Sequence, residues 1–215
     1  SEHEQAKAIN ASIAAFKAAG GDVMISLGGA NGVSLAQSYA QRGKSAQELA
    51  DAYGAVVDTY GLNRIDFDIE GNAVADPASI ALNAQALKLF QQERPDVEIW
   101  YTLPVLPTGL TADGLNVVES ALKAGVNLAG VNVMAMDYGD EYVAMGAHAI
   151  SAARATAAQL KAIPAFRRLS TAQRMALARR DDVEDVPLGT LRSEPQIVIA
   201  DDGVSLHVEV DEPEA

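Results

Sequence analysis

Three acidic side chains alternate with apolar ones in the segment Asp66-Phe-Asp68-Ile-Glu70. Side chains of a β-strand point alternately to its two faces, and neighbours on one face lie roughly 6.5–7 Å apart. If this segment is a strand, its three carboxylates share one face. Carboxylates held together away from water raise one another's pKa, so we expect at least one of them to be protonated near neutral pH. A protonated acid of this kind can serve as a general acid in catalysis.

Two other interpretations of the acidic segment stay open on the residues alone. The carboxylates could bind a hard cation such as Mg²⁺ or Ca²⁺, or they could line a solvated strand. A zinc or iron site is not expected, because the chain has no cysteine and its histidines, His3, His148 and His207, are scattered. Each histidine is expected at the surface.

Alternating strands and helices must position these acids. Apolar runs predict strands, and helical periodicity predicts the segments between them. The expected strands are residues 22–27, 65–69, 98–103 and 130–136, and the expected helices are residues 4–19, 45–60, 77–92, 112–124 and 144–163. Such spacing implies right-handed crossovers and a parallel sheet, hence an α/β fold. Active sites of such folds lie at the carboxyl ends of the strands.

The character of the chain changes after Pro164. A short charged helix is expected at residues 169–178, followed by a β-hairpin around the turn Asp201-Asp202-Gly203. An antiparallel hairpin does not continue a series of strand–helix units. We therefore expect a domain of residues 1–163 and a tail of residues 164–215.

Composition limits the classes of partner. The 215 residues are 49% hydrophobic and 21% charged, as in an ordinary globular protein, and the formal net charge is −13. That charge argues against binding nucleic acid or an acidic membrane surface. No apolar run approaches the roughly 20 residues of a membrane span, and the first residues lack the pattern of a secretory signal peptide.

Four segments carry further motifs at the spacing of strand–helix units. These are Ser26-Leu-Gly28-Gly29, the acidic segment 62–71, residues 101–110, and Asn132-Val-Met134-Ala-Met136-Asp137-Tyr138. They resemble the third to sixth strand motifs of glycoside hydrolase family 18, the chitinases and related endo-N-acetylglucosaminidases, over about residues 3–163. In the family signature Asp-x-x-Asp-x-Asp-x-Glu, only the first acid is replaced, by Asn63.

The resemblance implies hydrolysis of β-1,4-linked N-acetylglucosamine polymers by a substrate-assisted retaining mechanism, without metal or cofactor. Glu70 would protonate the leaving oxygen and later activate water. Asp68 would orient the acetamido group of the substrate, and Asp66 would share a proton with Asp68. The family is secreted, so an extracellular location is implied for this chain.

The resemblance also implies residues that contact the sugar. Asp137 occupies an acidic position after the sixth strand, and Met136 stands where the family has a tyrosine, so the hydroxyl could come from Tyr138. Ser26, Gly28 and Gly29 would form a tight turn that lets the backbone approach the site. Trp100, the single tryptophan, is expected to pack in the core.

The four recognised units correspond to half of an eight-stranded barrel. We therefore expect a TIM-barrel-type arrangement of (β/α) units that forms an incomplete barrel, with the C-terminal hairpin added. Uncovered sheet edges could then pair with a second copy of the chain. A non-catalytic carbohydrate-binding protein, or a barrel fragment that needs completion, is the alternative to an active hydrolase.

Overall fold

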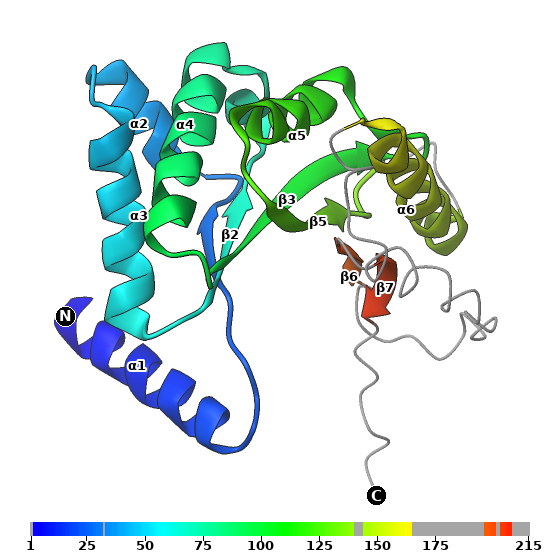
Figure 1. The fold of residues 1–215 in the computed structure, drawn as a ribbon. Coiled ribbons are helices and arrows are strands. Elements are labelled where there is room, and N and C mark those ends of the chain that lie inside the picture. Colours follow the sequence, from blue (N-terminus) through cyan, green and yellow to red (C-terminus); the bar gives the residue numbers. More distant parts are fainter. Residues whose placement is uncertain (1, 32, 140–143, 165–195, 201–202, 208–215) are drawn as a thin grey trace, which may run out of the picture.

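The computed structural model describes residues 2–31, 33–139, 144–164, 196–200 and 203–207, with side chains described between residues 7 and 164 of these ranges. The fold is mixed α/β, and its sheet is mainly parallel (Figure 1). Its strands are β1 (Ile25–Gly28), β2 (Arg64–Asp68), β3 (Glu98–Leu106), β4 (Gly109–Leu110), β5 (Leu128–Met134), β6 (Gln196–Ala200) and β7 (Gly203–His207).

Neighbouring strands follow the order of the chain. β1, β2, β3 and β5 are parallel, while β4 folds back antiparallel onto the end of β3. β6 lies antiparallel beside β5, and β7 lies antiparallel beside β6. The carboxyl ends of β1, β2, β3 and β5 therefore lie at one edge of the sheet.

Six α-helices and one short 3-10 helix are described. They are α1 (Glu2–Ala18), α2 (Leu35–Gln41), α3 (Ala46–Tyr60), η1 (Gly71–Ala75), α4 (Pro77–Glu93), α5 (Ala112–Ala124) and α6 (Met145–Ala162). Ser34 and Ser45 begin α2 and α3 with reciprocal capping boxes. Gly61 and Gly125 end α3 and α5 in the left-handed conformation. Within the described residues, no helix is long and apolar enough to cross a membrane.

One face of the sheet forms the core. Alternate strand residues such as Ile65, Phe67 and Tyr101 are buried in a single hydrophobic cluster with residues of α2 to α6. The intervening residues point to the opposite face, which we call the open face. There Trp100, Thr102 and Asn132 stay partly exposed, while Asp66 is buried.

A β-bulge determines which residues of β5 point to the open face. Ile99 pairs with Leu128, but Trp100 pairs with Gly130, so Ala129 is the extra residue. Beyond the bulge, Thr102 pairs with Asn132. Because strand side chains alternate, a one-residue shift moves every later side chain to the other face. Without the bulge, an apolar residue would stand beside Thr102.

The five predicted helices agree with the structure to within two residues at each end. The predicted strands 22–27 and 130–136 are displaced, since β1 begins at Ile25 and β5 ends at Met134. α2 and β4 were not predicted, although the capping pair Ser34 and Gln37 marks the start of α2. The predicted helix at residues 169–178 lies outside the described residues, as do Asp201 and Asp202 of the predicted turn.

Candidate active site

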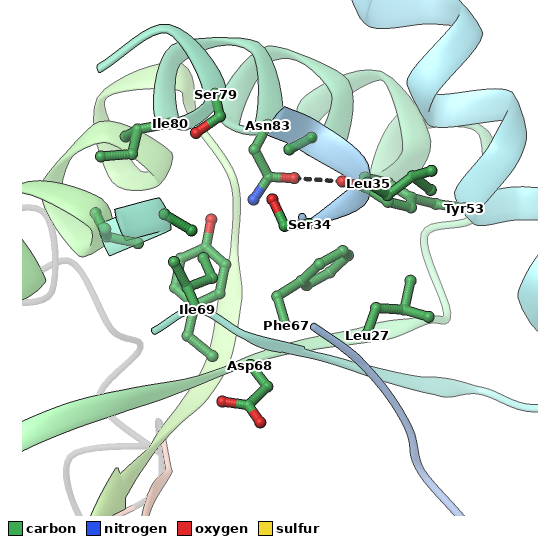
Figure 2. A pocket seen from close by; sticks show the side chains of 14 residues that line it. Leu27, Ser34, Leu35, Tyr53, Phe67, Asp68, Ile69, Ser79, Ile80 and Asn83 are labelled. Carbon is green, nitrogen blue, oxygen red and sulfur yellow. Dashed lines mark hydrogen bonds between the residues drawn. The ribbon is translucent and has the colours of Figure 1, made fainter. Parts of the chain in front are cut away.

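The end of β2 carries the acids that the sequence singled out. Ile65 and Phe67 enter the helix-covered core, so Asp66 and Asp68 point to the open face. Figure 2 shows the side chains of Phe67 and Asp68 on opposite sides of the strand. The extended chain continues past the strand, because the Ile69 amide donates to the Thr102 carbonyl oxygen at 3.0 Å.

Asp66 is 3% exposed and is held by two hydroxyl groups. The Ser26 hydroxyl donates to its Oδ2 at 2.6 Å, and Thr102 Oγ1 lies 2.9 Å from each of its carboxyl oxygens. Asn132 Nδ2 donates in turn to Thr102 Oγ1 at 3.1 Å. Burial raises the pKa of Asp66, and the hydrogen bonds from Ser26 and Thr102 oppose that rise.

Asp68 has a different environment. It is partly buried, and its buried Oδ1 atom has no hydrogen-bond partner within the described part of the chain. Burial, followed by the negative charges of Glu70 and Asp66, raises its pKa from 3.8 to about 6. This carboxyl group therefore exchanges its proton close to neutral pH and keeps an oxygen for another donor.

Glu70 lies two residues beyond Asp68, at the start of η1. Its backbone is extended and its side chain makes no capping hydrogen bond to the helix. It is partly exposed and close enough for its charge to act on Asp68. The structure thus places Asp66 and Asp68 on the open face at the end of β2, with Glu70 two residues further along and near enough for its charge to raise the pKa of Asp68.

Gly28, the last residue of β1, and Gly29, which follows it, bring the backbone against the acidic strand. The Gly29 amide donates to the Asp68 carbonyl oxygen at 3.1 Å. Gly28 has φ +132°, and a β-carbon at this position would collide with the same carbonyl oxygen. A residue with a side chain could not occupy this place without moving Asp68.

The predicted sugar-contacting residues after β5 are Met136, Asp137 and Tyr138, and the backbone between them is not regular strand. Asp137 is exposed with φ +51°, a left-handed conformation uncommon for a residue with a side chain. A left-handed residue interrupts the strand alternation that was expected between Met136 and Tyr138. Met136 is partly buried, whereas Tyr138 is buried and its ring packs edge-to-face against His148 of α6, with centroids 6.3 Å apart. His148 is only partly exposed, in part because its ring contacts Tyr138.

Thr102 and Asn132 are site residues that the sequence analysis missed. Both follow from alternation, but only once the face and the register of their strands are known. Trp100 also departs from expectation: it does not join the core and instead lies on the open face, where its Nε1 donates to Glu98 at 3.2 Å. Register with Asp66 places it there, because parallel partners share a face.

A small pocket lies behind the acidic strand, on the helix-covered side. Its polar lining includes Ser34, Ser79 and Asn83, and the Tyr53 hydroxyl donates to Asn83 Oδ1 at 2.8 Å (Figure 2). The carboxyl group of Asp68 points away from it. In the part of the chain that the structure describes, no group of three or more acidic or histidine side chains is arranged to hold a metal ion.

Comparisons with known proteins agree on one family. The sequence profile of Glycosyl hydrolases family 18 matches residues 3–178. Over 132 residues the chain is 52% identical to a probable bifunctional chitinase/lysozyme of Escherichia coli K12 and 51% identical to endochitinase 11 of Metarhizium anisopliae. That stretch is 60% of this chain but only 14% and 24% of those proteins.

The fold is similar to that of a solved chitinase. The catalytic domain of the hyperthermophilic chitinase from Pyrococcus furiosus matches with a TM-score of 0.65 at 32% identity. The match covers 77% of this chain and 51% of the solved one, so the chain spans about half of that domain. Because the family profile matches most of this chain, the chain belongs to glycosyl hydrolase family 18.

Proposed function

We propose that the chain carries the acid–base site of a chitinase-type hydrolase that cleaves β-1,4-linked N-acetylglucosamine polymers. The observation that supports this most directly is Asp68, which lies between two other acids, has a raised pKa and keeps a buried oxygen without a partner in the described residues. An acetamido N–H of the substrate is the kind of donor that this oxygen lacks. The named relatives are chitinases, which supports the same class of substrate.

In the proposed mechanism, the protein supplies the proton and the substrate supplies the nucleophile. Glu70 donates its proton to the glycosidic oxygen as the bond between that oxygen and the anomeric carbon breaks. The acetamido carbonyl oxygen of the same sugar attacks the anomeric carbon, giving an oxazolinium ion. Asp68 accepts a hydrogen bond from the acetamido N–H, and the Asp66–Asp68 pair carries one negative charge opposite the cation.

The second half of the reaction restores the enzyme. Glu70, now a carboxylate, takes a proton from water as the water oxygen attacks the anomeric carbon and opens the oxazolinium ring. Both displacements invert the anomeric carbon, so the product retains the original configuration. This scheme is the substrate-assisted variant of glycoside hydrolysis.

We assign the substrate-binding roles to residues at the ends of β1 and β5. Ser26, Gly28 and Gly29 fix the backbone and carboxyl groups of the acidic strand. Asp137, Met136 and Tyr138 would contact the acetamido group and the leaving sugar. The left-handed backbone at Asp137 supports this assignment, since strained residues cluster at functional sites.

We also propose the wider arrangement of the fold, its division into two segments, and the location and self-association of the protein. The parallel order β1-β2-β3-β5 supports a barrel-type arrangement of (β/α) units, with a catalytic segment of residues 1–163 and a tail of residues 164–215. Since β6 pairs with β5, that boundary divides sequence units rather than sheets. The protein is secreted in this proposal, as suits a polymeric substrate. Its exposed strand edges would support self-association, and the mass of the protein in solution tests this.

The test compares the wild-type protein with Glu70→Gln on a fluorogenic chitooligosaccharide. Glu119→Gln, an exposed change in α5, is the matched control. We expect release of the fluorophore by the wild type and the control, and a loss of at least about 100-fold in Glu70→Gln, because general acid catalysis contributes about that much. Equal rates for all three proteins, or none, would contradict hydrolysis by this chain. Oligomer binding without turnover would indicate a carbohydrate-binding protein instead.

A further inference from the structure

The hydrogen bonds across the open face have a fixed direction. Asn132 Nδ2 can only donate, and it donates to Thr102 Oγ1 at 3.1 Å. Thr102 has one hydroxyl hydrogen, which is then left for Asp66, whose two oxygens lie 2.9 Å from Oγ1. The chain Asn132 to Thr102 to Asp66 therefore ends on Asp66 as an acceptor.

The two aspartates of the site differ in the donors that they receive. Asp66 accepts from the Ser26 hydroxyl and the Thr102 hydroxyl, whereas Oδ1 of Asp68 is buried with no partner in the described residues. Hydroxyl donors stabilise a carboxylate more than a neutral carboxyl group. The negative charge of the pair is therefore better placed on Asp66, and the proton on Asp68.

We propose that Thr102 and Asn132 are positioning residues that hold Asp66 as the ionised member of the Asp66–Asp68 pair. This inference rests on the proposed function, because it concerns how the proposed catalytic pair divides its proton. Neither residue needs to touch the substrate. Thr102 acts through its hydroxyl on Asp66. Asn132 fixes the direction of that hydroxyl and also lowers the pKa of Asp66 through its own side-chain amide.

Few other charges face Asp66. Asp68 and Glu70 follow it on its own segment, and β3 adds Glu98 at its far end, paired with Arg64 at 2.8 Å. β1 and β5 contribute no charged residue to the sheet. Arg64, the cation two residues before Asp66 on β2, is paired with Asp22 at 3.1 Å and with Glu98 at 2.8 Å. The neutral donors are thus what favours its ionised form.

The direct test follows the carboxyl carbons of Asp66 and Asp68 by ¹³C NMR as the pH is changed, with Asp66→Asn and Asp68→Asn used to assign the signals. In the wild type we expect Asp66 to ionise at lower pH than Asp68. In Thr102→Val, which keeps the shape but lacks the hydroxyl, the ionisation of Asp66 should move up by about one pH unit, the effect of one hydrogen bond to a charged group. Asn132→Leu should move it in the same direction by a smaller amount.

Two control variants distinguish a positioning role of the Thr102 hydroxyl from a general loss of structure. Thr102→Ser restores a hydroxyl and should restore the wild-type titration, and Thr156→Val removes a buried hydroxyl of α6 and should change nothing. An Asp66 that titrates identically in the wild type and Thr102→Val, or one that ionises after Asp68 in the wild type, would overturn the proposal. Thermal unfolding of each variant shows that the comparison is made on folded protein.

A kinetic measurement adds a second readout. The acidic limb of the kcat/KM profile should move to higher pH in Thr102→Val and return in Thr102→Ser, while KM at high pH stays at the wild-type value. An acidic limb that does not move in a folded, active Thr102→Val would also count against the proposal. If the chain shows no hydrolysis, the proposed function fails, but the NMR titration still decides the role of Thr102 and Asn132.

Discussion

Gly28 lies directly against the carbonyl oxygen of Asp68, with no room between them for a β-carbon. The contact joins the glycine-rich end of β1 to the acidic end of β2, and the neighbouring Gly29 amide adds a hydrogen bond to the same oxygen. The position of the Asp68 backbone is therefore set by the absence of a side chain on the adjacent strand. This is the physical basis for a glycine in the Ser-x-Gly-Gly motif.

Gly28→Ala is expected to displace Asp68 and to unfold more readily. The added carbon must push the strands apart at a positive φ, so we expect a loss of about 3 kcal/mol in unfolding free energy. A displacement of the site by about 1 Å would lower hydrolysis by about 100-fold. Urea denaturation and the chitooligosaccharide assay measure the two effects.

Gly43→Ala is the control for the backbone conformation alone. Gly43 also has a positive φ, but nothing lies within 4 Å of an added β-carbon. We expect it to cost about 1 kcal/mol with full activity. Equal effects of the two substitutions would mean that the close approach to Asp68 is unimportant.

Asp68→Asn is expected to stabilise the fold at neutral pH. Because its pKa is raised from 3.8 to about 6 in the folded protein, the folded state binds more protons than the unfolded state between those values. The contribution of Asp68 to stability therefore falls as the pH rises through this window, and Asn avoids that loss. The gain should be about 1 kcal/mol above pH 6, since partial exposure screens the charges, and should vanish below about pH 4.

Unfolding by urea at a series of pH values checks this. Asp96→Asn, in the turn before β3, is the control for losing an exposed charge. A constant difference between Asp68→Asn and the wild type over the whole pH range would show that Asp68 does not titrate in this way.

Tyr53→Phe is expected to lower the unfolding free energy by about 1–2 kcal/mol, because it removes the donor to the buried Oδ1 of Asn83. Hydrolysis should be little affected, since this pair lies on the helix-covered side of β2. Tyr60→Phe, in the last turn of α3, is the matched control. A Tyr53→Phe protein as stable as the control would mean that water or another group replaces the lost hydroxyl.

Gln159→Glu is expected to weaken the contact between α6 and β4, the short strand that follows β3. The Gln159 amide group donates to the Leu110 carbonyl at 2.9 Å and accepts from the Leu110 amide at 2.8 Å, as a neighbouring strand would. A carboxylate keeps the acceptor but loses the donor, so we expect a cost of about 1–3 kcal/mol at pH 7.

At about pH 4 the introduced glutamic acid becomes protonated and can donate again, so part of this cost should disappear. Gln92→Glu, an exposed change at the end of α4, is the control. Denaturation at both pH values measures the difference. A cost that is the same at pH 7 and at acid pH would exclude loss of the donor as its cause.

The sequence alone located five of the helices and the two faces of the acidic strand. Helical periodicity and glycine ends located five helices, and alternation in residues 65–69 placed Asp66 and Asp68 opposite Ile65 and Phe67. These are local properties, because the period of a strand or a helix is written in neighbouring residues. The four motifs led to the family that the comparisons establish.

Only the tertiary structure decided which side chains surround the acids. Thr102 reaches Asp66 because β3 pairs in register with β2, and Asn132 reaches Thr102 because the bulge at Ala129 shifts β5 by one residue. Trp100 was expected in the core because the sequence did not show which face of its strand would carry it. Register depends on pairing between segments distant in the chain, and a shift of one residue exchanges the two faces of a strand. That information is absent from any single segment of the sequence.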